Sequence, residues 1–220
     1  MKAFVIIGRA FRTLYEELFP LMLMSVVTLL ATFLVLPGPF AQAGLWRVAQ
    51  NAAEGRETTW RVFWEGAKAY GPRNWANTLL LAAGYLLIAL NLWFYNNPNI
   101  SPLSPDVAVW LSAVWIALGV LWTAVAFYLL AFQLEMIEPS FWLSIRNALF
   151  LSLLHPIQTI IFLLLLGVIL LLCVQVPMLI PLLILLPGLS ATLSVTSVKT
   201  LVKPILEKEE AEEEKEATGK

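Results

Sequence analysis

The sequence predicts an all-α, polytopic membrane helix bundle, with about five transmembrane helices and additional interfacial amphipathic helices. The first observation is composition: 60% of the 220 residues are hydrophobic and 13% are charged, whereas about a quarter of the residues in a soluble domain are charged. The second is the mean hydropathy of +0.79. The third is that apolar runs of 18 or more residues recur along the chain, and one membrane span needs about 20 such residues. The net charge of −1 argues against nucleic acid as a partner, because nucleic acid binds basic surfaces.

The segment before residue 19 is an amphipathic, basic lead-in to the first apolar run. We expect it to form a helix in the headgroup region, followed by a retained transmembrane helix over residues 19–36. A cleaved signal peptide is the alternative, because Ala41-Gln42-Ala43 has the small residues of a cleavage site. The apolar run is longer than the about 7–15 residues of a signal sequence, which favours the retained helix. The expected apolar face of the lead-in contains Phe4, Ile7, Phe11, Leu14 and Leu18.

Two short amphipathic helices are predicted between the first and second spans, over residues 40–54 and 58–70. Pro37-Gly38-Pro39 ends the first apolar run and introduces them. In the 40–54 helix, the polar side chains are expected to point away from the apolar face. These polar residues are Arg47, Gln50, Asn51 and Glu54.

The 58–70 segment has an aromatic stripe opposite a charged face. The stripe comprises Trp60, Phe63 and Trp64, and the charged face comprises Arg61, Glu65 and Lys68. Such a pattern is typical of a helix lying in the membrane interface, and a helix docked on the rest of the protein is the alternative. Thr58 is the predicted N-cap, Gly71-Pro72 is the predicted stop, and Arg61 can pair with Glu65 at i,i+4.

Four further spans are predicted downstream. The last two come from 43 consecutive largely apolar residues, which are long enough for a tight helical hairpin with its turn near Gln175-Val176-Pro177. Residues 199–220 are rich in Glu and Lys without an apolar stripe, so we expect a solvated tail of fraying helix or disorder. The four spans cover residues 75–95, 107–132, 156–175 and 178–198.

A short motif occurs twice and predicts an internal duplication. Phe63-Trp64 is followed by Lys68, and 78 residues later Phe141-Trp142 is followed by Arg146 at the same offset. Residues 19–95 and 107–176 would then share one plan, and substrate sites often lie between such repeats. Coincidence among aromatic residues in an apolar chain is the alternative. The candidate interfacial or partner surface comprises Trp60, Phe63, Trp64, Lys68, Phe141, Trp142 and Arg146.

The sequence contains no catalytic or metal-binding motif that we can identify. No ionisable residue falls well inside the five predicted spans, where proton-coupled carriers and many ion pathways keep such groups. His155 and Cys173 are the only histidine and cysteine, and a metal site needs several ligands. We therefore expect no enzymatic activity, no cofactor and no metal.

Short motifs carry a family resemblance: LPGP at residues 36–39, Ala43, and Phe63-Trp64 with Lys68. Through these motifs the chain resembles the YesL family. This is a family of bacterial membrane proteins of about this length whose function is unknown. The likeness covers most of the chain in layout, through short motifs. The resemblance implies an integral membrane protein associated with carbohydrate uptake systems, and it supplies no catalytic residues.

These observations predict a non-enzymatic integral membrane protein that acts as an accessory or assembly partner of a larger membrane system such as carbohydrate uptake. Its expected partners are the lipid bilayer and transporter subunits or other membrane proteins. The alternative is a small solute transporter or channel that acts alone through uncharged polar groups. These groups are Asn77, Asn91, Gln158, Gln175, Ser190 and Ser194.

The charge distribution predicts a multi-pass protein of the bacterial inner membrane with its C-terminus in the cytoplasm. Residues 39–74 carry five Lys or Arg, whereas connectors 96–106 and 174–178 carry none, so the positive-inside rule places 39–74, the Arg146 segment and the tail inside. Five spans would leave the N-terminus outside, in conflict with its own Lys and Arg residues.

Overall fold

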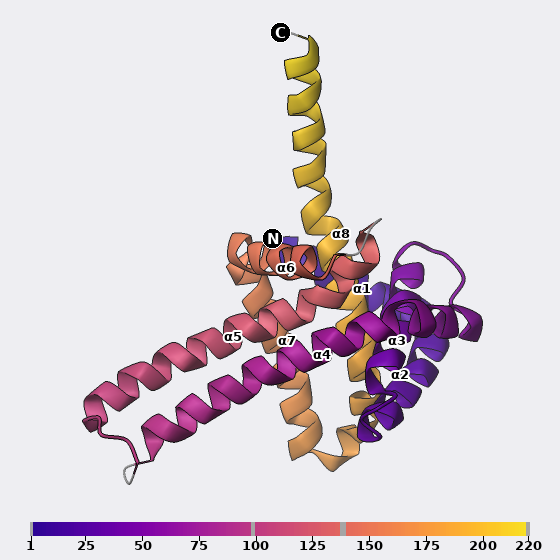
Figure 1. Cartoon of the computed structure of the whole chain (residues 1–220). Coiled ribbons are helices and arrows are strands. Elements are labelled where there is room, and N and C mark those ends of the chain that lie inside the picture. The colour runs from indigo at the N-terminus through magenta and orange to yellow at the C-terminus, as the bar shows by residue number, and fades with distance from the viewer. Residues whose placement is uncertain (1, 98–99, 137–139, 219–220) are drawn as a thin grey trace.

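The structure is a computed structural model that describes residues 2–97, 100–136 and 140–218. Within these ranges the chain forms eight α-helices and one short 3₁₀ turn, without a strand (Figure 1). The predicted all-α fold class is therefore confirmed. Four helices are long and apolar enough to cross a membrane, and a pair of N-terminal helices bent by 92° is a fifth candidate. The chain is a multi-pass membrane protein.

The N-terminal helix α1 (Lys2–Glu16) is amphipathic, as predicted, but it buries a different set of side chains. Ala3, Ile6 and Ala10 are buried, and α1 packs mainly on the last helix, α8 (Ile180–Thr218). Of the predicted apolar face, Phe4 and Phe11 are exposed on the outer surface, whereas Leu14 is buried. The two alanines explain the difference, because small side chains let helices approach closely.

Helices α2 (Leu18–Phe33) and α3 (Gly38–Ala53) form a hairpin whose two arms begin and end at the same end of the molecule. Near the tip, Thr28 Oγ1 donates to the Ala41 carbonyl at 3.3 Å. At the open end, Thr58 donates to the carboxylate of Glu17. The predicted span over 19–36 stays a prediction, because the bent pair of α1 and α2 is still a candidate crossing. The first apolar run is one arm of a hairpin that returns to its starting end, because α3 follows the Pro-Gly-Pro turn and packs back along α2.

Helix α3 is buried on most of its surface, contrary to the amphipathic surface helix predicted over 40–54. Gln50 and Asn51, expected to point outward, are only 4% and 8% exposed. Gln50 Nε2 donates to the Leu134 carbonyl at 3.2 Å, and Asn51 Nδ2 donates to the Glu57 carbonyl at 2.9 Å. These polar side chains therefore bond to neighbouring segments of the protein.

Helix α4 (Trp60–Asn96) runs for 37 residues, so the stop predicted at Gly71-Pro72 is wrong. Gly71 lies directly against the Phe40 ring of α3, without room for a Cβ, and Asn74 Nδ2 donates to the Pro39 carbonyl at 2.8 Å. Packing on α3 thus holds the backbone helical where the proline removes one helical hydrogen bond. The residue before the helix is Thr59, which makes no side-chain cap, and the predicted cap Thr58 bonds to Glu17 instead.

The remaining helices form a second hairpin, a crossing helix and a third hairpin. Helix α5 (Pro105–Glu135) packs along α4, and α6 (Phe141–Leu154) packs mainly on α5. Helix α7 (Pro156–Gln175) reaches α8 through the 3₁₀ turn η1 (Pro177–Leu179), which confirms the predicted turn. In Figure 1 the α4–α5 hairpin runs obliquely to α7 and α8, and the connectors of both hairpins lie toward the lower edge.

Helix α8 is the centre of the bundle, because α1, α2, α3, α5 and α7 all pack on it. Its buried face carries small polar residues that bond to backbone. Ser194 Oγ donates to the Phe127 carbonyl of α5 at 2.5 Å, while Thr192 Oγ1 donates to the Gly188 carbonyl of its own helix at 2.9 Å. Small side chains of this kind allow the close helix contacts on which membrane bundles depend.

The two aromatic motifs occupy different structural contexts. Phe63-Trp64 lies in the first turns of α4, which continues without a break into the next apolar run. Phe141-Trp142 begins α6, a separate helix of 14 residues that ends before α7. Since the plans of residues 19–95 and 107–176 differ in this way, the predicted duplication is not supported.

Candidate functional site

The aromatic residues predicted at 58–70 form one cluster that is partly docked on α3. The Trp60 and Phe63 rings stack with centroids 5.0 Å apart, and the Trp64 ring meets Phe63 edge-on at 6.1 Å. Phe63 is buried, whereas Trp60 and Trp64 are 41% and 50% exposed. Phe63 lies against Gly44 of α3, where a Cβ would contact its ring. The alternative of a helix docked on protein is therefore what the structure shows for Phe63.

The second predicted aromatic group lies elsewhere in the bundle. Phe141 and Trp142 meet edge-on with centroids 5.6 Å apart, on α6, which packs on α5 and α7. Trp142 and Arg146 are exposed, as is Lys68 of the first group. Because the first group packs on α3 and the second lies on α6, the structure does not join the seven predicted residues into one site.

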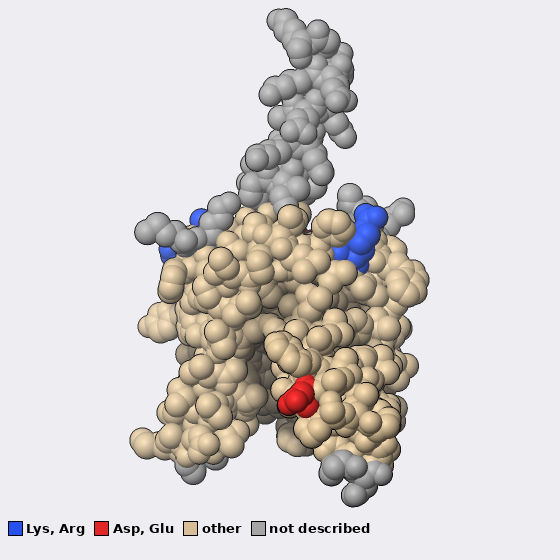
Figure 2. Space-filling model, turned by 90° about the vertical axis from the view of Figure 1, so that its left-hand side faces the viewer, with Lys and Arg blue, Asp and Glu red and all other residues tan. Residues whose placement is uncertain are grey.

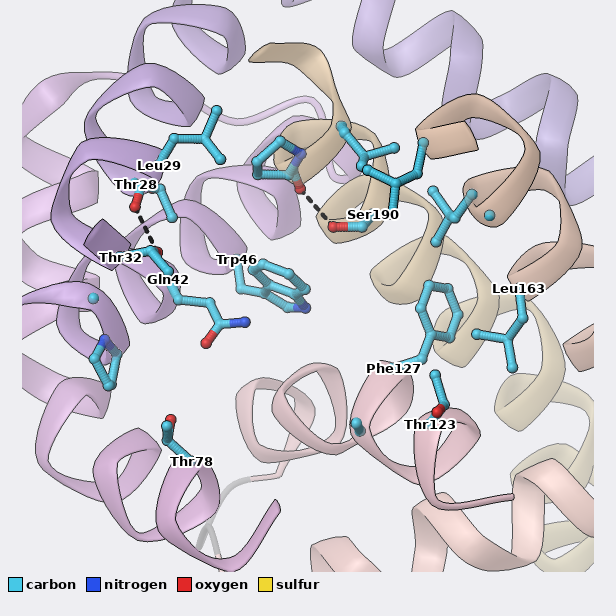
Figure 3. Close-up of a pocket in the computed structure, with 18 of the residues that line it drawn as sticks. Thr28, Leu29, Thr32, Gln42, Trp46, Thr78, Thr123, Phe127, Leu163 and Ser190 are labelled. Carbon is cyan, nitrogen blue, oxygen red and sulfur yellow. Dashed lines mark hydrogen bonds between the residues drawn. The ribbon is translucent and has the colours of Figure 1, made fainter. Parts of the chain in front are cut away.

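A cavity of about 670 Å³ lies between the helical hairpins. Its wall takes residues from α2, α3, α4, α5, α7 and α8, and Figure 3 shows these side chains surrounding an open centre. Most of the lining is apolar. The exposed Gly167 and Leu170 of α7 form part of the wall. The apolar lining includes Leu29, Val35, Phe127, Leu163, Leu166 and Leu186.

The hydroxyl groups of the cavity wall donate to backbone carbonyls of their own helices. Thr78 Oγ1 donates to the Asn74 carbonyl and Thr123 Oγ1 to the Gly119 carbonyl, each at 2.8 Å. Thr28, Thr32 and Ser190 donate in the same way. The donors of these hydroxyls are therefore already used.

Two N–H donors of the cavity wall, on Trp46 and Gln42, differ from these hydroxyls because no hydrogen bond within the described residues uses them. The Trp46 side chain is 7% exposed, and its buried Nε1 has no hydrogen-bond partner among the described residues. In Figure 3 the Trp46 ring forms part of the wall of the hollow, with Gln42 beside it. Gln42 Oε1 accepts from Asn74 Nδ2 at 3.1 Å, and none of the hydrogen bonds of the described residues uses its Nε2. Both residues belong to α3, four positions apart, so they lie on one helix face.

A buried chain of amides fixes the orientation of Gln42. Asn74 Nδ2 donates both to the Pro39 carbonyl and to Gln42 Oε1. Because a carbonyl oxygen can only accept, the nitrogen of Asn74 must face Pro39, and the oxygen of Gln42 must face that nitrogen. Nε2 of Gln42 is thereby left for another partner. Behind Asn74, the chain continues to Asn77, whose Nδ2 donates to Asn74 Oδ1 at 3.3 Å.

A charged cluster joins α3, α5 and α8 at the end where the α2–α3 hairpin opens. Lys199 Nζ bonds to Glu54 and lies 3.4 Å from Glu135 Oε1. Glu135 also accepts from Gln50 Nε2 at 2.9 Å. Of these ionic groups, Glu54 lies about 12 Å along α3 from Trp46, at 1.5 Å per residue, and none of the three lines the cavity.

Most of the polar groups assigned to a transport path are occupied or lie outside the cavity. Ser190 alone among the six lines the cavity wall. Asn77 pairs with Gln133, and Ser194 bonds to the Phe127 carbonyl. Asn91 Nδ2 donates to the Leu87 carbonyl of its own helix at 2.8 Å. Gln158 lies on a separate surface depression beside His155.

Sequence reasoning missed Trp46 and Gln42. The signal was a Gln and a Trp four residues apart directly after a Pro-Gly-Pro turn, but only the fold turns that helix face inward. Buried Cys173 contacts the Leu179 carbonyl (Sγ–O 3.4 Å). In the described ranges no group of three His, Cys, Asp or Glu side chains could hold a metal ion.

Comparisons of the chain with protein-family models, curated proteins and solved structures find no match.

Proposed function

We propose that the protein is a non-enzymatic membrane protein that holds an apolar guest in the cavity between its hairpins, as an accessory to a larger membrane system. The observation that carries this proposal is the cavity itself. Its volume of about 670 Å³ falls within the range of about 300–1,000 Å³ that is typical of small-molecule sites. Its wall is apolar and the exposed Gly167 and Leu170 belong to it, so a guest can enter from the lipid phase.

The size of the cavity favours a lipid-like molecule over a helix of a partner protein. An α-helix with its side chains is about 10–12 Å wide, and a 20-residue helix is about 30 Å long, so it fills more than about 2,000 Å³. A cavity of about 670 Å³ takes less than half of that volume. A partner protein would therefore contact the outer surface of the bundle, where Trp64 and Trp142 are exposed.

The alternative of a channel for polar solutes has less support. A polar solute exchanges its hydration for hydrogen bonds with the wall, and an unpaired polar group costs several kcal/mol in an apolar environment, about 2–7 by transfer scales. The wall hydroxyls donate to backbone, and Asn77 pairs with Gln133 away from the cavity. Membership of the YesL family and a link to carbohydrate uptake stay predictions.

The fold also supports a cytoplasmic location for both ends of the chain. The Thr58–Glu17 bond joins the two ends of the α2–α3 hairpin on one side, and we propose α4, α5, α7 and α8 as the crossings. An even number of crossings puts the basic N-terminus on the side of residues 54–73, which removes the conflict with the positive-inside rule. On the face in Figure 2, Lys and Arg lie near the upper edge, and the broad middle has neither.

A cavity-filling substitution tests the proposed function. A Cβ on Gly167 meets nothing within 4 Å, so Gly167→Phe should fold and occupy the cavity with its ring. Gly8→Phe is the matched control, because Gly8 is equally open and lies on α1, outside the cavity wall. Native mass spectrometry of protein purified from membranes in mild detergent should find a lipid adduct on the wild type and on Gly8→Phe, but not on Gly167→Phe. The same adduct on all three proteins would refute the proposal.

A further inference from the structure

The cavity contains a donor whose burial calls for a partner. Trp46 Nε1 is buried and has no partner among the described residues, although its ring lines the cavity. An unsatisfied buried donor costs free energy, and such groups in native proteins normally have a partner. In Figure 3 the Trp46 ring forms part of the cavity wall, so a guest against that wall lies next to this buried N–H.

The second available donor lies on the same face. Among the described residues Gln42 Nε2 has no hydrogen bond, because Pro39 and Asn74 orient the amide with its oxygen toward Asn74. Residues four apart on a helix are neighbours, with Cβ atoms about 5–6 Å apart. The cavity therefore presents two neutral donors side by side, and the matching group on a guest is a hydrogen-bond acceptor.

The electrostatics of the wall limit that acceptor to an uncharged group. No Lys, Arg, Asp, Glu or His is among the lining residues. Trp46 lies about 12 Å along α3 from Glu54, at 1.5 Å per residue. A phosphate or carboxylate at this depth would be desolvated without a counter-charge, which is strongly unfavourable. A carbonyl oxygen meets both conditions, since it is neutral and accepts two hydrogen bonds.

We propose that the cavity binds an uncharged lipid whose carbonyl oxygen accepts hydrogen bonds from Trp46 Nε1 and Gln42 Nε2, while its hydrocarbon lies against Phe127, Leu163 and Leu166. This inference rests on the proposed function and names the guest by its chemistry. Two classes of membrane lipid supply such a carbonyl: the ester of a diacylglycerol and the ring ketone of an isoprenoid quinone. The wall residues provide the same contacts to either of them.

The test compares carbonyl-bearing lipids with a lipid that lacks the carbonyl. Detergent-purified full-length protein is titrated with dioleoylglycerol, with its ether-linked analogue dioleylglycerol, or with a menaquinone, and the bound fraction is read by native mass spectrometry. One or two hydrogen bonds should make a carbonyl lipid bind about two- to tenfold more tightly than the ether lipid. Preference for dioleoylglycerol identifies the ester as the source, and preference for the quinone identifies the ring ketone.

A conservative variant assigns the preference to Trp46. Trp46→Phe removes the N–H and keeps an aromatic ring, so it should abolish or strongly reduce the carbonyl preference. Trp110→Phe is the control, because Trp110 is 76% exposed and outside the cavity wall, and it should retain the full preference. The wild-type comparison needs no substitution, so it stands even where Trp46→Phe folds poorly.

Equal binding of the ether and carbonyl lipids by the wild type would overturn the inference. So would a carbonyl preference that survives in Trp46→Phe. The wild type could bind the three lipids equally while Gly167→Phe binds none of them. That result would keep the apolar cavity as the functional site and reject only the carbonyl contact. The two proposals therefore fail separately.

Discussion

Asn77 of α4 and Gln133 of α5 exchange two hydrogen bonds through their side-chain amides. Asn77 Nδ2 donates to Gln133 Oε1 at 2.9 Å, and Gln133 Nε2 donates to Asn77 Oδ1 at 3.0 Å. Each side chain is 1% exposed. Such reciprocal pairing fixes the register of two apolar helices that could otherwise slide past each other, because polar groups bond across helices where lipid offers no alternative partner.

Breaking this amide pair on one side should be more costly than replacing both amides. Asn77→Leu leaves Gln133 buried without its partner, and we expect a loss of about 1–3 kcal/mol in unfolding free energy. Asn77→Leu with Gln133→Leu should lose less than the sum of the two single changes. Thermal unfolding in detergent measures the double-mutant cycle. Asn91→Leu is the control, since Asn91 Nδ2 donates to the Leu87 carbonyl of its own helix. Additive losses at 77 and 133 would show that the pair is not coupled.

A glycine allows α4 and α5 to approach at a second point. A Cβ on Gly84 would lie 2.4 Å from the Trp122 indole, whose Nε1 donates to the Leu81 carbonyl at 3.2 Å. We expect Gly84→Ala to displace the indole and to lower unfolding free energy by about 1–3 kcal/mol, as overpacking does. At Gly119 on the facing helix the nearest atom is Ile88 Cγ2 at 3.7 Å, so Gly119→Ala should be tolerated. Equal melting temperatures for the two variants would contradict this packing.

Val35, at the tip of the α2–α3 hairpin, has a φ of +61°. A β-branched residue is strained in this left-handed region, at a cost of about 1–3 kcal/mol. Val35→Gly should relieve the strain and raise unfolding free energy by up to about 1 kcal/mol, since glycine also gains freedom in the unfolded chain. The neighbouring Leu34 is similarly exposed, but its backbone has the right-handed helical conformation. Leu34→Gly relieves no strain and should therefore destabilise the protein. A loss of stability in both variants would show that residue 35 is unstrained.

The topology can be tested by labelling single cysteines, because the native Cys173 is buried. Arg9→Cys on α1 and Glu57→Cys after α3 should react with an impermeant maleimide from one side of the membrane. Ser104→Cys, in the connector before α5, should react from the other side. All three positions are exposed. Reaction of positions 9 and 104 from the same side would mean that the first apolar run, residues 19–36, crosses the membrane as a single span.

The features that the sequence predicts correctly depend on local chemistry. The turn near Gln175-Val176-Pro177 was predictable because two spans had to share 43 apolar residues. The Arg61–Glu65 pair, at 2.7 Å, was predictable from its spacing alone. The predicted span over 156–175 coincides with α7, because both of its ends have local signals: a proline begins the helix and a polar residue ends it.

The incorrect predictions share a cause in tertiary packing. Gly71-Pro72 has the local chemistry of a helix stop, but contacts of Gly71 with Phe40 and of Asn74 with Pro39 keep α4 helical. Gln50 was assigned to an outward face, because its partners, Leu134 and Glu135, lie 84 and 85 residues away. The cavity donors escaped prediction for the same reason, since the inward direction of Gln42 and Trp46 is set by five other helices.

The central position of α8 has a consequence for the order in which the protein can be made. Helices α1, α2 and α3 pack on α8, but α8 begins at Ile180, 127 residues after α3 ends at Ala53, or roughly 6–25 s later at about 5–20 residues per second. During that interval the N-terminal hairpin is inserted without the surface that finally covers it. A nascent chain that stops after α7 leaves Ser25, Leu21 and their neighbours without the Gly188 region against which they pack. The N-terminal hairpin therefore acquires its final packing only after α8 has been synthesised and inserted.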